Sequence, residues 1–215
     1  MKYYRYSLNL VFLNIASLVI FAVFFVILSL MGYASLIDYR CLVIYFFWMF
    51  LHEFLHGVGF SLRKNVDHKK IVYGANLEKG IFYCMCKDII DKRCIMISLM
   101  FPFVFIGVIT LIIGLLFNIP ILVILSLFNI AGCAGDIAMF ISFLKLPDFK
   151  YTDLDDCTGY ILISENDLSR FKLFGVKLVE SGDYDPSVKA KDYKKFTISK
   201  LSWIVLIFMI LLFFI

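Results

Sequence analysis

Residues 41–62 read CLVIYFFWMFLHEFLHGVGFSL, an apolar run long enough to cross a bilayer that contains the pattern His52-Glu53-Phe54-Leu55-His56. In a helix, residues four positions apart lie one turn apart on the same face. The H-E-x-x-H spacing therefore lets both imidazoles bind one Zn²⁺, while Glu53 can act as general base on the activated water. With 3 His in 215 residues, such a pattern arises by chance in roughly one shuffled chain per thousand.

The setting of this pattern favours a function over a purely structural role. Ionisable groups inside an apolar helix cost a few kcal/mol each, and membrane interiors seldom carry them without a task. The alternative is that the two histidines and Glu53 hydrogen-bond to one another within a helical bundle.

The composition is that of an integral membrane protein. The chain is 62% hydrophobic and 18% aromatic, with a mean hydropathy of +0.90, whereas soluble domains are about half apolar. The net charge of +4 is not gathered into basic clusters that alternate with aromatics, so we expect no nucleic-acid partner. The expected surroundings are a lipid bilayer.

The apolar segments predict a mainly α fold, a polytopic membrane helical bundle with about five transmembrane helices. Pro102 is expected to kink the third of them. The segments cover about residues 8–33, 41–62, 94–118, 121–144 and 197–215.

The positive-inside rule orients this bundle. Linkers 63–93 and 145–196 are rich in lysine and arginine, whereas the 34–40 link carries Arg40 alone and the 119–120 turn has no basic residue. We therefore expect a multi-pass protein of the cell membrane, with the N-terminus and both long linkers in the cytoplasm.

The two linkers predict small polar elements. Two segments rich in β-branched and aromatic residues predict a cytoplasmic β-hairpin at about 71–85, either a structured connector or a substrate-binding edge. Residues 146–196 predict a small mixed α/β cytoplasmic element, with strands at 158–163 and 174–179 and a short helix at 164–171. The expected organisation is thus a membrane core at 1–145 with four helices, the 146–196 element, and a C-terminal transmembrane helix at 197–215.

The acidic run Asp153, Asp155 and Asp156 lies within the second linker. It lacks the glycine and the distal glutamate of an EF-hand loop, so we expect a solvated turn there.

A catalytic zinc normally has three protein ligands, and Asp136 is the candidate for the third. The histidine pair lies 6 to 10 residues before the predicted cytoplasmic end of its helix, and Asp136 lies 8 residues before the end of its own. These depths coincide within about one turn. Asn129 stands two turns before Asp136 on the same face, where it could bind a substrate carbonyl or form a packing bond between helices.

These features resemble a known pattern, that of the site-2 protease class of intramembrane zinc metalloproteases. The chain resembles more closely a bacterial group of membrane zincin peptidases. In that group a hairpin with Tyr-Cys (Phe82-Tyr83-Cys84) follows the H-E-x-x-H helix, and helices with an early proline (Pro102) and with Asn and Gly-Asp (Asn129 and Gly135-Asp136) come next. The resemblance covers about residues 45–165. It implies that His52, His56 and Asp136 bind zinc.

The expected function is hydrolysis of a peptide bond in a membrane-associated protein or peptide, with Glu53 as general base and Asn129 as a substrate-binding residue. The alternative is a zinc-binding membrane protein without catalysis, such as a regulatory or immunity factor. A small ion transporter is disfavoured, because the outer half of the predicted bundle offers almost no polar path.

Overall fold

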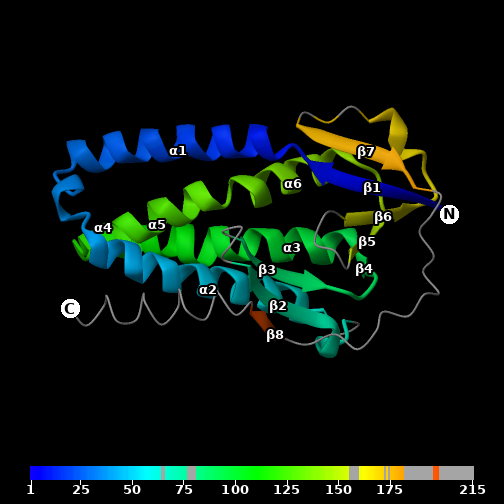
Figure 1. The fold of residues 1–215 in the computed structure, drawn as a ribbon, viewed down its shortest axis with the longest axis horizontal. Coiled ribbons are helices and arrows are strands. Elements are labelled where there is room, and N and C mark those ends of the chain that lie inside the picture. The colour runs from blue at the N-terminus through cyan, green and yellow to red at the C-terminus, as the bar shows by residue number, and fades with distance from the viewer. Residues whose placement is uncertain are drawn as a thin grey trace.

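The computed structural model describes residues 1–63, 66–76, 81–154, 160–171, 173, 175–181 and 196–198. The fold is mainly helical, with antiparallel sheet (Figure 1). Its helices are α1 (Leu10–Leu30), α2 (Tyr39–Ser61), α3 (Lys92–Pro102), α4 (Thr110–Leu116), α5 (Pro120–Gly132) and α6 (Ala134–Lys145), with a π-helix at Phe103–Ile109 and 3₁₀ turns at Ala34–Leu36, His68–Lys70 and Leu168–Arg170. The strands are β1 (Lys2–Leu8), β2 (Ile71–Asn76), β3 (Ile81–Cys86), β4 (Ile90–Asp91), β5 (Lys150–Asp153), β6 (Tyr160–Ser164), β7 (Val176–Glu180) and β8 (Phe196–Ile198).

Three helical stretches are long and apolar enough to cross a membrane: Val11–Leu30, Tyr39–Ser61 and Lys92–Leu116. A fourth crossing is possible if α5 and α6, which meet at a bend of 49°, form one broken span. These stretches correspond to the first four predicted segments. The fifth, at 197–215, lies outside the described residues except for its first two positions, so the count of five is not confirmed.

Local sequence signals explain where the helices begin. Asn9 caps α1 by accepting a hydrogen bond from the Phe12 N–H, and Asp38 caps α2 by accepting from the N–H groups of Arg40 and Cys41. Such side chains satisfy donors that a helix leaves free in its first turn. Pro120 occupies the first turn of α5, where its missing N–H costs nothing.

Pro102 marks a change in the third apolar segment, where α3 gives way to the π-helix Phe103–Ile109. Proline has no N–H, so it cannot bond to the carbonyl of residue 98, four positions earlier. The helical path continues beyond it as one stretch to Leu116. The proline therefore leaves one carbonyl oxygen, that of Ser98, without its usual helical partner.

A five-stranded sheet in the order β4-β5-β6-β1-β7 lies at the end of the molecule that holds the N-terminus (Figure 1). Its strands precede α1, precede α3 and follow α6, so these helix ends are gathered at one end of the fold. Two of its strands, β6 and β7, correspond to the strands predicted at 158–163 and 174–179. The helix predicted at 164–171 is only a 3₁₀ turn at Leu168–Arg170.

Strand β1 is part of this sheet although it was not predicted. It pairs with β6, where Tyr4 lies opposite Leu162, and with β7, where Tyr6 lies opposite Leu178. Tyr4 and Tyr6 are fully buried, and the Tyr6 ring packs on Phe143 of α6 at 5.2 Å between centroids. Burial of alternate residues is the pattern of a strand with one face on the core.

The predicted hairpin is confirmed as β2 and β3, paired antiparallel from Ile71 opposite Cys86 to Asn76 opposite Ile81. The hairpin packs against α2, where the centroid of the Phe82 ring lies 4.7 Å from that of Phe50 and 5.5 Å from that of Phe46. Strand β8 adds to β2 in parallel, which gives a three-stranded sheet in the order β3-β2-β8.

The expectation of a solvated acidic turn is wrong for Asp153. This residue ends β5 and is buried, because its carboxylate accepts hydrogen bonds from the Cys86 N–H at 2.7 Å and from the Tyr151 hydroxyl at 2.8 Å. Buried polar groups are normally paired in this way. Asp155 and Asp156 lie outside the described residues.

Candidate metal centre

His52 and His56 lie one turn apart on α2, as the spacing predicts. Their Nε2 atoms are 3.1 Å apart. His56 is buried, and the His52 side chain is 14% exposed. The two imidazoles therefore converge on one point inside the helical bundle.

Asp136 reaches the same point from α6. Its two carboxylate oxygens lie 3.3 Å from His52 Nε2 and 3.5 Å from His56 Nε2. The bend at Cys133 ends α5, so Asp136 sits in the first turn of the new helix. His52, His56 and Asp136, which the sequence places at similar depths in the membrane, therefore come together, with ligand atoms within 4.8 Å of one another.

The other nitrogen of each imidazole has its own partner. His56 Nδ1 lies 2.9 Å from the Ser98 carbonyl oxygen, and His52 Nδ1 lies 2.9 Å from Asn129 Oδ1. Both acceptors lack a proton to give, so each Nδ1 carries the N–H and donates it. In the neutral imidazole each Nε2 then presents a lone pair to the cluster, which is the state of a metal-ligating histidine.

The orientation of the Asn129 amide follows from its second contact. Its Nδ2 group donates to the Pro102 carbonyl at 3.2 Å, which turns Oδ1 toward His52. Asn129 is 2% exposed. Its amide thus has protein partners on other helices at both ends, as the packing alternative expects, and contact with substrate remains a prediction.

Pro102 also explains why the Ser98 carbonyl can serve His56. Without the proline, the N–H of residue 102 would be the helical partner of that oxygen. Ser98 is held close to α2 by a reciprocal bond, in which its hydroxyl donates to the His56 carbonyl at 2.8 Å. Gly59 permits this approach, since a Cβ there would lie 2.5 Å from the Ser98 Cα.

The donor set fits zinc. A tetrahedral zinc with nitrogen and oxygen ligands at about 2.0–2.1 Å requires donor atoms about 3.3–3.4 Å apart. Here the two Nε2 atoms are 3.1 Å apart, one Asp136 oxygen lies 3.3 Å from His52 Nε2, and its other oxygen lies 3.5 Å from His56 Nε2. His52, His56 and Asp136 would hold the metal.

Glu53 lies beside this cluster on α2 and is partly exposed. Cys84 of β3 lines the same cavity as Glu53. Glu53 lines two hollows, the cavity that contains the cluster and a smaller apolar groove between α2 and the hairpin. Glu53 is thus placed to exchange protons with a molecule in the cavity.

The cavity around the cluster has a volume of about 300 Å³. Phe82–Met85 of β3 line one wall, and Tyr151, Asp153 and Tyr160 line the part next to the five-stranded sheet. Burial raises the pKa of Asp153 to about 6, although the Cys86 N–H and the Tyr151 hydroxyl both favour its charged form. The sequence did not indicate Asp153 as part of the cavity, although Tyr151 and Thr152 before it are residues typical of a strand.

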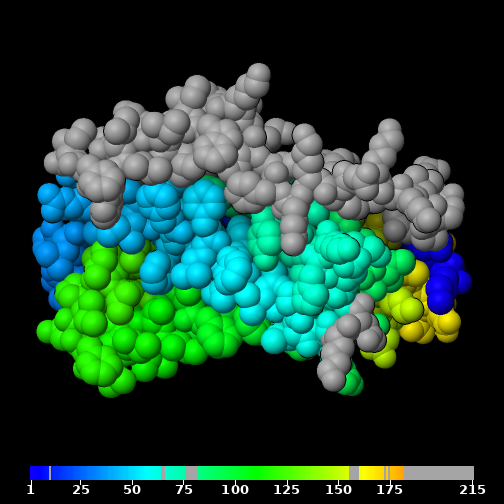
Figure 2. All heavy atoms as spheres, turned by 90° about the horizontal axis from the view of Figure 1, so that it is seen from below, coloured from blue at the N-terminus to red at the C-terminus, as the bar shows by residue number. Residues whose placement is uncertain are grey.

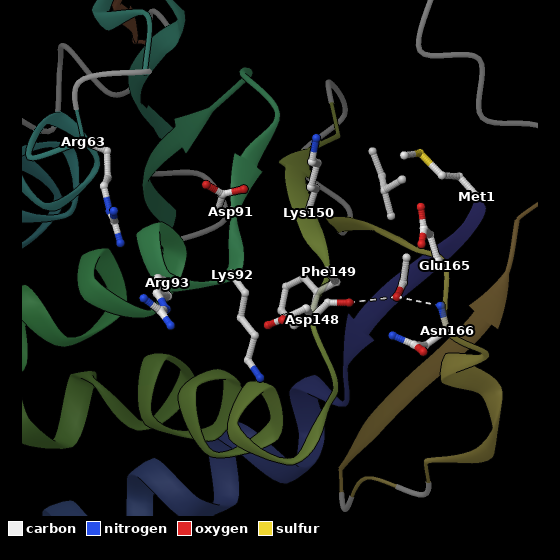
Figure 3. A pocket seen from close by; sticks show the side chains of 12 residues that line it. Met1, Arg63, Asp91, Lys92, Arg93, Asp148, Phe149, Lys150, Glu165 and Asn166 are labelled. Atoms are coloured by element: carbon white, nitrogen blue, oxygen red, sulfur yellow. Dashed lines mark hydrogen bonds between the residues drawn. The ribbon is translucent and has the colours of Figure 1, made fainter.

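A larger cavity of about 530 Å³ lies at the sheet end and shares no lining residue with the first (Figure 3). Charges of both signs line it, including Arg63, Arg93, Asp91 and Glu165. Figure 3 shows Lys92 extending from the start of α3, and its ammonium group donates to the Leu146 carbonyl at 2.6 Å. No histidine lines this cavity, so it lacks the chemistry of the first.

Comparison with known proteins agrees with the geometry. Residues 45–151 match the model of a family described as "Putative zincin peptidase", and this range contains all the ligand candidates and Glu53. Searches of curated proteins and of solved structures gave no match. The family match supports a zincin-like peptidase family for residues 45–151.

Proposed function

We propose that this protein is an intramembrane zinc metallopeptidase that hydrolyses a peptide bond of a membrane-associated protein or peptide. The observation that carries the proposal is the convergence of His52 Nε2, His56 Nε2 and the Asp136 carboxylate within 3.5 Å. The family match suggests a zinc metallopeptidase independently of that geometry.

The residues of the chain divide the chemistry among them. When bound, zinc supplies Lewis-acid polarisation of the scissile carbonyl and lowers the pKa of water. Glu53 takes a proton from the attacking water and later delivers it to the leaving amine. Asn129 and the Ser98 carbonyl hold the imidazoles in the required tautomer, so we assign Asn129 a positioning role.

The position of the site supports action within the membrane. His52, His56 and Glu53 lie on a helix that is apolar and long enough to span the bilayer. The positive-inside rule assigns the end with the five-stranded sheet to the cytoplasm. Residues preceding α1, preceding α3 and following α6 meet in that sheet, which agrees with their lying on one side.

The hairpin offers a place for an extended substrate. Strand β3 is the end strand of its sheet and forms a wall of the cavity beside Glu53. Extended peptides commonly bind by adding a strand to such an edge. A membrane segment that unwinds locally would therefore lie along β3, with its scissile bond next to the cluster.

Loss of Glu53 tests this function. We expect Glu53→Ala cells to accumulate at least one membrane precursor, as seen by proteomics of membrane fractions, while the purified variant keeps about one zinc per chain. Glu165→Ala is the matched control, because Glu165 is exposed and lies outside the cavity. A Glu53→Ala protein with full cleavage would show that Glu53 is not the base, and zinc binding without any turnover in the wild type would favour a non-catalytic protein.

A further inference from the structure

A buried carboxylate lies in the cavity of the cluster and has no role in the proposed reaction. Asp153 ends β5 and lines this cavity together with Glu53 and Asp136. It is 9% exposed, and its two oxygens accept one hydrogen bond each, from the Cys86 N–H and from the Tyr151 hydroxyl. A carboxylate offers about four acceptor positions. Asp153 therefore keeps acceptor positions for a further donor that enters the cavity.

The charge of Asp153 is not balanced by the other described residues in the wall of the cavity. Among them there is no lysine or arginine. Lys87 is near enough to favour the charged form of Asp153, but it does not line the cavity, and its ammonium group donates to the Leu154 carbonyl at 2.5 Å. When zinc is bound, its two positive charges offset those of Asp136 and Glu53. The lining groups then keep one excess negative charge, which attracts a cation into the cavity.

The surroundings of Asp153 suit the side chain of lysine or arginine. Tyr151 and Tyr160 both line the cavity, with ring centroids 5.5 Å apart, and aromatic faces attract cations. Phe60 and Leu99 are among the apolar residues of the other walls, where an aliphatic stem can pack. A carboxylate with aromatic and apolar neighbours thus matches a long basic side chain.

Tyr160 connects Asp153 with the residues of the cluster. Burial raises the pKa of its hydroxyl, and the charges of Asp153, Asp136 and Glu53 raise that pKa further. One side chain therefore lies within electrostatic range of Asp153 and of the groups assigned to the reaction. A substrate with its scissile bond next to Glu53 can thus place a neighbouring side chain at Asp153.

Strand β3 defines where a bound peptide would meet Asp153. The Lys87 N–H bonds to the Lys70 carbonyl on the side of β2, whereas the Cys86 N–H points the other way, to Asp153. Backbone groups of alternate residues share an edge, so Cys84 offers its N–H on the same free edge as Cys86. Cys86 lies about 7 Å beyond Cys84. A peptide strand paired along this edge would therefore end against Asp153.

Asp153 lies at the cytoplasmic end of that path. It belongs to the five-stranded sheet, at the end of the molecule that the positive-inside rule assigns to the cytoplasm. Figure 2 shows α2, the hairpin and this sheet following one another along the long axis of the molecule. Membrane segments carry an excess of lysine and arginine in their cytoplasmic flanks. A membrane peptide along β3 thus brings its basic flank to Asp153.

We propose that Asp153 selects substrates by pairing with a lysine or arginine side chain on the cytoplasmic side of the scissile bond. The inference rests on the proposed peptidase function and names its substrate class, which is membrane peptides with a basic cytoplasmic flank close to the bond that is cut. Asp153 determines specificity and takes no part in proton transfer at the cluster.

Peptide binding to the zinc-loaded full chain tests the proposal, with Glu53→Ala present so that the peptides stay intact. The probes are apolar membrane peptides, acetylated and amidated, with one lysine in a Gly-Ser flank at either end, placed at each flank position in turn. At the best position we expect the lysine peptide to bind about 10- to 100-fold more tightly than the same peptide with norleucine. Fluorescence anisotropy in nanodiscs measures the two affinities.

Adding Asp153→Asn to Glu53→Ala should abolish this preference, because asparagine keeps the size of the side chain and removes its charge. Asp148→Asn is the matched control and should keep the preference, since Asp148 is exposed and lines the other cavity. Equal binding of the lysine and norleucine peptides while Asp153 is intact would overturn the proposal, and this comparison does not depend on how Asp153→Asn folds.

Cleavage by the wild type separates this proposal from the proposed function. A wild type that cuts the lysine and norleucine peptides equally well would overturn the pairing with Asp153 and leave the peptidase function standing. A wild type that neither binds nor cuts any of the peptides would overturn both.

Discussion

Replacing Asn129 with alanine removes the acceptor that holds His52. The bond from His52 Nδ1 to Asn129 Oδ1 is 2.9 Å long and buried, and the other nearby acceptor, Cys133 Sγ, is 4.0 Å from the same nitrogen. Loss of such an outer partner typically weakens metal binding about 10- to 100-fold, or about 1.4–2.7 kcal/mol. The cost of leaving a buried donor unpaired is about 1–3 kcal/mol, which agrees.

We therefore expect Asn129→Ala to bind zinc about 10- to 100-fold more weakly than the wild type, measured by competition with a chelating dye in detergent. Ser126→Ala is the control, because Ser126 is buried on the same helix but its hydroxyl bonds to Leu122 and Thr110. Its zinc affinity should stay within about twofold. A folded Asn129→Ala protein with wild-type affinity would refute the positioning role of Asn129.

The three residues of the cluster could be predicted from the sequence, but the hydrogen-bond acceptors that hold the two histidines could not. His52 and His56 follow from helical spacing, and Asp136 is the acidic residue of the fourth apolar segment, at a depth that supports the choice. The acceptor for His56 is a backbone carbonyl, which every residue carries, so residue type gives no signal for it. Pro102 is the available clue, because a proline in a helix frees the carbonyl four residues earlier.

The sheet was harder to predict, because its strands are distant in sequence. Strand β1 is short and adjoins a long apolar run, so the alternation that buries Tyr4 and Tyr6 gives only a weak signal in the sequence. In the sequence, Asp153 is part of an acidic run that predicts a solvated turn. Its burial arises from pairing with Cys86, 67 residues away, and long-range contacts of that kind leave no local pattern.

Two further changes test the packing and the buried acid. Gly59→Ala should destabilise the protein by about 1–3 kcal/mol and lower its melting temperature in detergent, because the new Cβ would lie 2.5 Å from the Ser98 Cα. Gly135→Ala is the control and should not lower the melting temperature, because no atom lies within 4 Å of the added Cβ. Equal melting temperatures for the two variants would contradict this packing. The raised pKa of Asp153, about 6 against an ordinary 3.8, means that the folded protein holds its proton more tightly than the unfolded chain, so this contribution to stability is present at low pH and is lost as the pH rises through about 6. The wild type should lose about 3 kcal/mol of folding stability between about pH 4 and pH 7, and Asp153→Asn should remove this loss. Melting temperatures across that range measure it, and the variant Asp148→Asn, at an exposed residue, should keep the loss. An unchanged pH profile in Asp153→Asn would contradict the raised pKa of Asp153.

X-ray absorption of the zinc-loaded full chain identifies the atoms bound to the metal and so tests whether His52, His56 and Asp136 hold it. We expect nitrogen and oxygen donors at about 2.0–2.1 Å, with outer-shell scattering from two imidazoles. Five cysteines of the described chain are free, and Cys133 lies close to His52. A sulfur donor at about 2.3 Å, or a spectrum without two imidazoles, would contradict a centre built from His52, His56 and Asp136.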